Sequence, residues 1–169
     1  VLLKSSDQSP RLPTYHFAHV VDDTLMRVTV VLRGEEWISS VPVHLQLFNA
    51  LGFEPKPYAH IAPLMKFDGA SRRKLSKRKD NEADVAFYME SGYPAGAVLH
   101  YLRGLANSRF AEMTFEESAS SALSLSECGV AGPIFDLVKL ESISREFIAQ
   151  LPTEEALESV LTWARANDP

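Results

Sequence analysis

The sequence predicts an α/β fold followed by an all-α region within 169 residues. Two observations lead to this fold class. The first 65 residues alternate apolar β-branched runs with an amphipathic segment, whereas beyond residue 80 the apolar residues recur only at helical spacing. Hydrophobic residues make up 46% of the chain and charged residues 23%, which is typical of a folded globular protein and excludes a disordered one.

The first part of the chain contains a strand, helix and strand in succession. Residues 28–32 are apolar and β-branched, so we expect a strand buried on both faces, as in a parallel sheet. An amphipathic helix then begins at Ser39, carries Pro42 in its first turn and ends at Gly52, a usual C-cap residue. A second apolar run at residues 59–65 completes a βαβ unit.

The rest of the chain is predicted to be helical. Residues 114–132 are rich in Ser, Ala and Glu and carry the weakest signal, so we expect a boundary there. The expected helices occupy residues 85–92, 94–105, 136–140, 144–151 and 153–166.

Composition also limits the compartment. No apolar run approaches the roughly 20 residues that a membrane-spanning helix needs, so no membrane partner is expected. The first residues lack the basic start and apolar centre of a signal peptide. A single cysteine, Cys128, excludes an internal disulfide and a cysteine-based zinc site. These features predict a cytoplasmic protein.

The most concentrated feature is a basic octet at residues 72–79, which holds six of the 17 basic residues of a chain with net charge −5. We expect it on an exposed loop between a turn at residues 68–71 and a helix-opening stretch at residues 80–84. Such a local positive site favours a polyanion, for example a nucleotide phosphate or an RNA backbone. A solvated basic face without chemistry is the alternative.

Arg33 is the second candidate ligand residue, because it follows the predicted strand where α/β folds place ligand contacts. A guanidinium there suits bidentate capture of a carboxylate, although a surface ion pair with Glu35 or Glu36 is also open. His16 and His19 stand three residues apart, but no cysteine or third histidine has metal-ligand spacing, so no metal site is predicted.

The segment Lys74-Leu75-Ser76-Lys77-Arg78 resembles the K-M-S-K-S signature of class I aminoacyl-tRNA synthetases. Further stretches agree in order and extend the resemblance over nearly the whole chain. They are residues 13–23 (PTYHFAHVVDD), residues 33–37 (RGEEW), Phe135 with Asp136, and Lys139 with Leu140. Together they are similar to the glutamyl-tRNA synthetase family, from the second half of the catalytic region onward.

This resemblance implies a domain organisation. Residues 1–80 would be the second half of a Rossmann-like catalytic domain, residues 81–125 a helical stem-contact region, and residues 126–169 the helical start of an anticodon-binding region. The half that carries the family's H-I-G-H signature is absent from these residues, so the chain alone is expected to be inactive.

The resemblance also implies an activity, ATP-dependent activation of glutamate and its transfer to tRNA(Glu). The partners would be tRNA(Glu), L-glutamate, and ATP with Mg²⁺ as substrate, without a prosthetic group. A glutaminyl-tRNA synthetase relative is one alternative, and a non-catalytic RNA-binding module is another.

Site roles follow from the matched positions. In the family, a mobile-loop lysine stabilises the transition state, which assigns catalysis to Lys77, with Lys74 in support. The remaining implied roles are ATP binding for Lys77, Trp37 and Ser76, glutamate binding for Tyr15, His19 and Arg33, and RNA contact for Arg72, Arg73, Arg78 and Lys79.

His19 departs from the family, which often has Asn there. A histidine titrates near neutrality, so a charged His19 would favour an acidic substrate.

Overall fold

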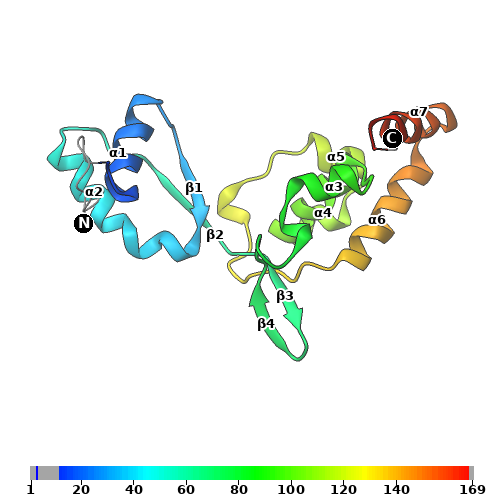
Figure 1. Cartoon of the computed structure of the whole chain (residues 1–169), viewed down its shortest axis with the longest axis horizontal. Coiled ribbons are helices and arrows are strands. Elements are labelled where there is room, and N and C mark those ends of the chain that lie inside the picture. Colours follow the sequence, from blue (N-terminus) through cyan, green and yellow to red (C-terminus); the bar gives the residue numbers. More distant parts are fainter. Residues whose placement is uncertain (1–2, 4–11, 168–169) are drawn as a thin grey trace. The chain divides into compact units, whose positions relative to one another are not determined.

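The computed structural model describes residue 3 and residues 12–167, which belong to two compact units, Val1–Ile61 and Ala62–Pro169 (Figure 1). The first unit contains α1 (Tyr15–Leu25), β1 (Val31–Gly34), the 3-10 helix η1 (Glu35–Ser40), α2 (Val41–Ala50) and β2 (Tyr58–Ile61). The second contains β3 (Met65–Asp68), β4 (Ser71–Lys74), η2 (Asn81–Ala83), α3 (Val85–Glu90), α4 (Ala95–Ala106), η3 (Ser108–Glu112), α5 (Phe115–Ser120), η4 (Leu125–Glu127), α6 (Leu137–Gln150) and α7 (Thr153–Asn167).

The first unit is a βαβ arrangement, as predicted. β1 and β2 pair in parallel, with Arg33 opposite His60, and α2 lies between them in the chain. Gly52 follows α2 with φ +70°, a left-handed conformation that costs glycine little, so the predicted helix end is confirmed. The helix itself begins later than expected, because residues from Glu35 form η1 first.

The prediction of a strand buried on both faces is wrong for β1. The strand begins at Val31, and Leu32 remains 51% exposed. Within the described chain β1 pairs with one neighbour, β2. The buried side chains of this unit come mainly from α1 and α2, and they include Val20, His44 and Phe48.

The second unit begins with an antiparallel hairpin, β3 and β4, joined by a turn at Gly69 with φ +61°. The hairpin extends away from the helices of its unit (Figure 1). Its strands take up Arg72, Arg73 and Lys74, so the expectation that the whole octet forms a loop is wrong. The glycine turn brings Ser71–Lys74 back along Met65–Asp68, where backbone hydrogen bonds outweigh the loop-like composition.

The predicted apolar strand at residues 59–65 is divided between both units. β2 ends at Ile61, and β3 begins at Met65, whose N–H donates to the Pro133 carbonyl at 2.8 Å. Pro63 lies between the two strands and cannot donate a ladder hydrogen bond. This interruption explains why a single strand does not form.

After residue 80, every secondary-structure element of the described chain is a helix, which confirms the second half of the predicted fold class. The core of this region consists of Tyr88, Tyr101, Phe135 and Leu140. The Tyr101 hydroxyl donates to the Asp136 carbonyl at 3.0 Å and accepts from the Asp136 N–H at 2.7 Å, which fixes the start of α6 against α4.

Two helix predictions need correction. Residues 137–150 form one helix instead of two, because the segment contains no Gly or Pro and Leu140, Ile143 and Phe147 recur on one face. The weakly patterned region also contains α5, which begins with a capping box between Thr114 and Glu117. The predicted domain limits at residues 80 and 125 stay predictions.

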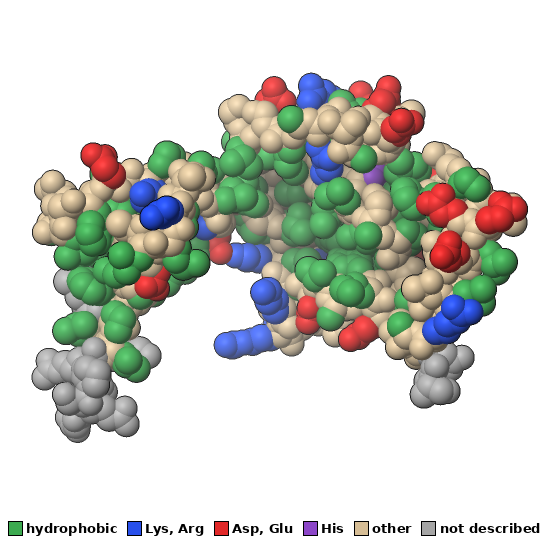
Figure 2. Space-filling view, turned by 90° about the horizontal axis from the view of Figure 1, so that it is seen from above, with side chains coloured by type: hydrophobic (Ala, Val, Ile, Leu, Met, Phe, Trp, Pro, Cys, Tyr) green, Lys and Arg blue, Asp and Glu red, His purple; other side chains and the backbone are tan. Residues whose placement is uncertain are grey.

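Charge is uneven along the chain. Residues 110–169 contain 3 basic and 11 acidic side chains, and Figure 2 shows acidic side chains gathered where α7 lies in the second unit. Of the helices described, none combines the length and hydropathy needed to cross a bilayer.

Candidate active site

The four candidate residues of the first unit come together. Tyr15 and His19 lie one turn apart on α1, and their rings stack with centroids 5.6 Å apart. Trp37 in η1 lies 4.6 Å from Tyr15 by ring centroids, and the Arg33 Cζ is 5.9 Å from the Trp37 ring. One arginine therefore lies beside aromatic and imidazole rings, an arrangement suited to an anionic group with an attached apolar chain.

Arg33 is held by three neutral acceptors. Its Nε donates to His60 Nε2 at 3.1 Å, one terminal nitrogen contacts His44 Nδ1 at 3.2 Å, and the other donates to the Trp37 carbonyl at 3.1 Å. Its Cζ also lies 4.6 Å from the centroid of the Tyr58 ring. These contacts orient the guanidinium, and none of the three acceptors neutralises its charge.

The sequence analysis did not identify His44, Tyr58 or His60. A signal for His60 was available, because a βαβ unit whose two strands are in register places a residue of β2 directly beside Arg33. His44 was assigned only to an amphipathic helix, yet its side chain is fully buried and contacts Arg33. Apolar periodicity cannot distinguish a buried polar residue from an exposed one.

His19 lies between an acid and a phenol. Its Nδ1 is 3.0 Å from Asp23 Oδ2, and its Nε2 is 2.9 Å from the Tyr58 hydroxyl. Burial lowers the pKa of His19, with smaller contributions from Arg33 and His16, although Asp23 opposes the shift. We therefore assign a neutral imidazole at pH 7, which moves the expected charge effect of His19 to acidic pH.

The second unit holds the signature segment. Leu75 and Ser76 follow β4, and residues 77–79 form a turn with exposed side chains. The Lys79 N–H donates to the Ser76 carbonyl at 3.0 Å, and the Asp80 N–H donates to the same oxygen at 2.9 Å. The turn thus closes on Ser76 and presents Lys77 to solvent.

Asp80 anchors this turn and was missed as a functional candidate. Its carboxylate accepts two hydrogen bonds from Arg73, at 2.6 and 2.8 Å, and one from the Ser76 N–H at 2.9 Å. Lys66 Nζ lies 3.5 Å away and also bonds Glu82. Asp80 is only 4% exposed, and the Arg73 hydrogen bonds, then the Ser76 N–H, hold its pKa well below the usual range.

Arg73 therefore differs from its neighbours in the octet. Its Nε also donates to Asp68 at 3.0 Å, so two carboxylates surround one guanidinium. The hydrogen bonds that Arg73 donates to Asp80, and then the one to Asp68, raise the pKa of Arg73 further. Arg72 donates to the Gly132 carbonyl at 2.8 Å, which ties the hairpin to the loop before α6. The predicted RNA contacts of the octet stay predictions.

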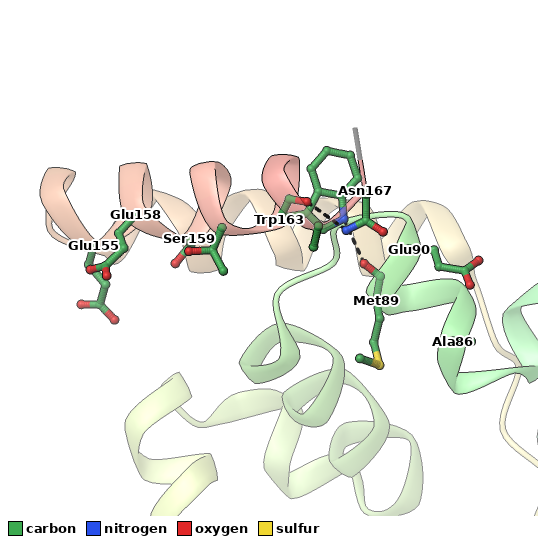
Figure 3. Close-up of a pocket in the computed structure, with 10 residues that line it drawn as sticks. Ala86, Met89, Glu90, Glu155, Glu158, Ser159, Trp163 and Asn167 are labelled. Carbon is green, nitrogen blue, oxygen red and sulfur yellow. Dashed lines mark hydrogen bonds between the residues drawn. The ribbon is translucent and has the colours of Figure 1, made fainter. Parts of the chain in front are cut away.

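A cavity of about 660 Å³ in the second unit lies between α3 and α7 (Figure 3). The Trp163 indole N–H donates to the Met89 carbonyl at 2.9 Å on its wall. Glu90, Glu155 and Glu158 line the same cavity. Three carboxylates disfavour an anionic ligand, so this cavity does not suit ATP, glutamate or RNA.

Metal binding has no support in the described chain. No group of three His, Cys, Asp or Glu side chains is placed to hold a metal ion among residues 12–167. Cys128 is half-buried, and its thiol contacts the Ser124 carbonyl at 3.7 Å.

Along the chain, a βαβ unit with the Arg33 cluster is followed by a hairpin with the signature segment and then by a helical region. Residues 4–141 match the model of the family "tRNA synthetases class I (E and Q), catalytic domain", and the chain belongs to this family. The resemblance found in the signature segment is thereby confirmed.

Two curated relatives of the chain are glutamate–tRNA ligases. The chain is 48% identical over 161 residues to a glutamate–tRNA ligase of Clostridium perfringens, covering 93% of this chain and 30% of the relative. It is 47% identical over 169 residues to a glutamate–tRNA ligase of Acetivibrio thermocellus, covering 98% and 30%. The chain thus spans about a third of the length of these curated relatives.

A solved structure similar to this chain is also that of a glutamate tRNA ligase. The crystal structure of a glutamate tRNA ligase from Elizabethkingia meningosepticum, in complex with its amino acid, superposes with a TM-score of 0.72 at 27% identity. The match covers 93% of this chain and 34% of that one.

Proposed function

We propose that this chain is part of a glutamate–tRNA ligase, which activates glutamate with ATP to an adenylate and transfers it to tRNA(Glu). The main observation in support is that three neutral acceptors orient the Arg33 guanidinium beside Tyr15 and Trp37. A permanent charge in a planar fork matches the side-chain carboxylate of glutamate.

The remaining residues complete this assignment. Tyr15 and His19 contact glutamate with Arg33, and Trp37 lines the adenosine site. Ser76 and Lys77 approach the phosphates of ATP, Lys74 supports their loop, and the tRNA backbone is contacted by Arg72, Arg78 and Lys79, whereas Arg73 is engaged by Asp80 and Asp68. The βαβ unit is then part of a Rossmann-like catalytic domain in a cytoplasmic enzyme.

Lys77 has the role with the clearest chemistry. Adenylate formation concentrates negative charge on the α-phosphate and on the departing pyrophosphate. A lysine on an exposed turn can close onto these groups in the transition state, so its binding energy lowers the barrier without tightening the ground state. ATP brings Mg²⁺ with it as substrate, and no prosthetic group takes part.

The test is glutamate-dependent ATP–pyrophosphate exchange by the full-length ligase. Lys77→Ala should lower kcat by about 10²- to 10³-fold with little change in KM. Lys79→Ala removes the same charge two positions away and should change kcat far less. Equal, small losses in both variants would show that the octet is only an electrostatic surface.

The same assay distinguishes the alternatives. The family model covers enzymes for glutamate and for glutamine, and a neutral amide gains less from Arg33 than a carboxylate does. Exchange with glutamine but not glutamate would replace the proposed substrate. If the full-length wild-type protein showed no exchange with either amino acid, the remaining alternative would be a non-catalytic RNA-binding module.

A further inference from the structure

The hydrogen bonds of Arg33 fix which nitrogen of its histidine partners carries a proton. A guanidinium has five N–H groups and no acceptor, and it is not deprotonated in proteins. His44 Nδ1 and His60 Nε2, at 3.2 and 3.1 Å from the Arg33 nitrogens, must therefore be lone-pair acceptors. His44 then carries its proton on Nε2, and His60 carries its proton on Nδ1.

The neighbouring rings are consistent with this assignment. His44 Nε2 lies 2.9 Å from His16 Nδ1, so the proton on His44 has an acceptor. His19 donates from Nδ1 to Asp23 and accepts at Nε2 from the Tyr58 hydroxyl. Each of these contacts can then have one donor and one acceptor, with every ring neutral and without two protons facing each other.

The surroundings of His44 favour the neutral form. Its side chain is fully buried, and burial lowers its pKa to about 4, with smaller contributions from His19, Arg33 and His16. The titratable and charged groups that face this network are Tyr15, His16, His19 and Asp23 from α1, Arg33 from β1, and Tyr58 and His60 from β2. The one carboxylate among them, Asp23, is bound by His19.

We propose that His44 and His60 are positioning residues for Arg33, neutral acceptors that aim the guanidinium while leaving its charge for a carboxylate ligand. This inference rests on the proposed function, because glutamate is the ligand. Arg33 donates three of its five N–H groups to the protein, and two remain for the carboxylate. A carboxylate in place of either histidine would orient Arg33 equally well but would neutralise it.

A series at His60 separates orientation, charge and packing in the full-length ligase. His60→Gln keeps a neutral acceptor near the position of Nε2 and should keep KM for glutamate within about threefold of wild type. His60→Leu removes the acceptor and should raise this KM by about 10- to 100-fold, with a smaller change in kcat. His60→Glu keeps an acceptor and adds a negative charge, so it should raise KM at least as much as His60→Leu.

A matched pair tests the buried partner. His44→Asn places an amide oxygen near the position of Nδ1, and it should lose less glutamate affinity than His44→Leu. His100→Leu is the control, because His100 is a buried histidine of α4 in the second unit. It should leave KM for glutamate unchanged. Equal KM values for the leucine variants and their amide counterparts would overturn the proposal and leave only packing.

An activity-independent measurement decides the matter if a variant fails to fold. Long-range ¹H–¹⁵N correlation spectra of the wild-type protein, labelled with ¹⁵N-histidine, report which ring nitrogen is protonated. At pH 7.5 we expect the proton on Nε2 of His44 and on Nδ1 of His60. The opposite tautomer at His44 would overturn the proposal even in an active enzyme, whereas absent glutamate exchange with the expected tautomers would contradict the proposed function alone.

Discussion

Arg33 and Arg73 are both held by several hydrogen bonds, but their partners differ in charge. Arg33 donates to two imidazoles and a carbonyl, whereas Arg73 donates to the carboxylates of Asp80 and Asp68 and to the Lys74 carbonyl. A guanidinium among neutral acceptors is oriented and keeps its charge. One between carboxylates is neutralised and serves the structure of the turn.

The largest expected effect follows from this contrast. Arg33→Lys keeps the charge but loses the planar fork, so kcat/KM for glutamate in the full-length ligase should fall by about 10³-fold. Arg73→Lys should leave KM for glutamate unchanged, because Arg73 contacts Asp80 and Asp68. Steady-state kinetics with varied glutamate measures both. A similar rise in KM in the two variants would remove the distinction.

Asp80→Asn should have the next largest effect. The amide keeps the volume but cannot accept both Arg73 hydrogen bonds and the Ser76 N–H, so the turn that presents Lys77 should lose its fixed position. We expect kcat for adenylate formation to fall by about 10²-fold. Asp68→Asn is the control, because Asp68 has a 66% exposed side chain and one hydrogen bond from Arg73. It should cost far less.

Acid should affect the stability of the histidine cluster before that of the Asp80 cluster. The pKa of His44 is lowered from 6.5 to about 4, so the unfolded state takes up a proton first and stability is lost as pH falls. Between pH 7 and 5 the free energy of unfolding should decrease by about 2 kcal/mol. Asp80, with its pKa held below the usual range, stays ionised over this interval.

The two tryptophans allow this difference to be measured, since Trp37 belongs to the first unit and Trp163 to the second. In the 169-residue chain, Trp163→Phe leaves Trp37 fluorescence as the probe of urea unfolding for the first unit. In this background, His44→Asn should reduce the decrease in the free energy of unfolding between pH 7 and 5. An equal decrease with and without His44→Asn would mean that His44 does not cause the loss of stability in acid.

The smallest effect concerns His19. Because burial lowers its pKa, His19 should gain charge only below pH 6.5, and preference for glutamate over glutamine should strengthen by about threefold as it does. Wild type and His19→Asn should therefore agree at pH 8 and diverge only as the pH falls into the acidic range. Parallel profiles would exclude His19 from substrate discrimination.

The amino-acid pattern was sufficient to predict the βαβ unit, the helical second half and the family. Local signals were sufficient there, since Gly52 and Gly92 end helices with positive φ, and the order of motifs along the chain needs no coordinates. It also indicated Tyr15, His19, Arg33 and Trp37, which the structure brings together.

The surroundings of each charged side chain could not be predicted from the sequence, because they depend on how the chain folds back on itself. The octet appeared as six equivalent cations, yet Arg73 faces two carboxylates because β4 folds back on β3 and Asp80 turns inward. His44 appeared as one position of an amphipathic helix, yet its fully buried side chain accepts from Arg33 of β1. Whether a guanidinium is available to a ligand depends on the side chains that contact it. Asp80 is 7 residues from Arg73 and His44 is 11 residues from Arg33, and hydrophobic periodicity does not encode such contacts.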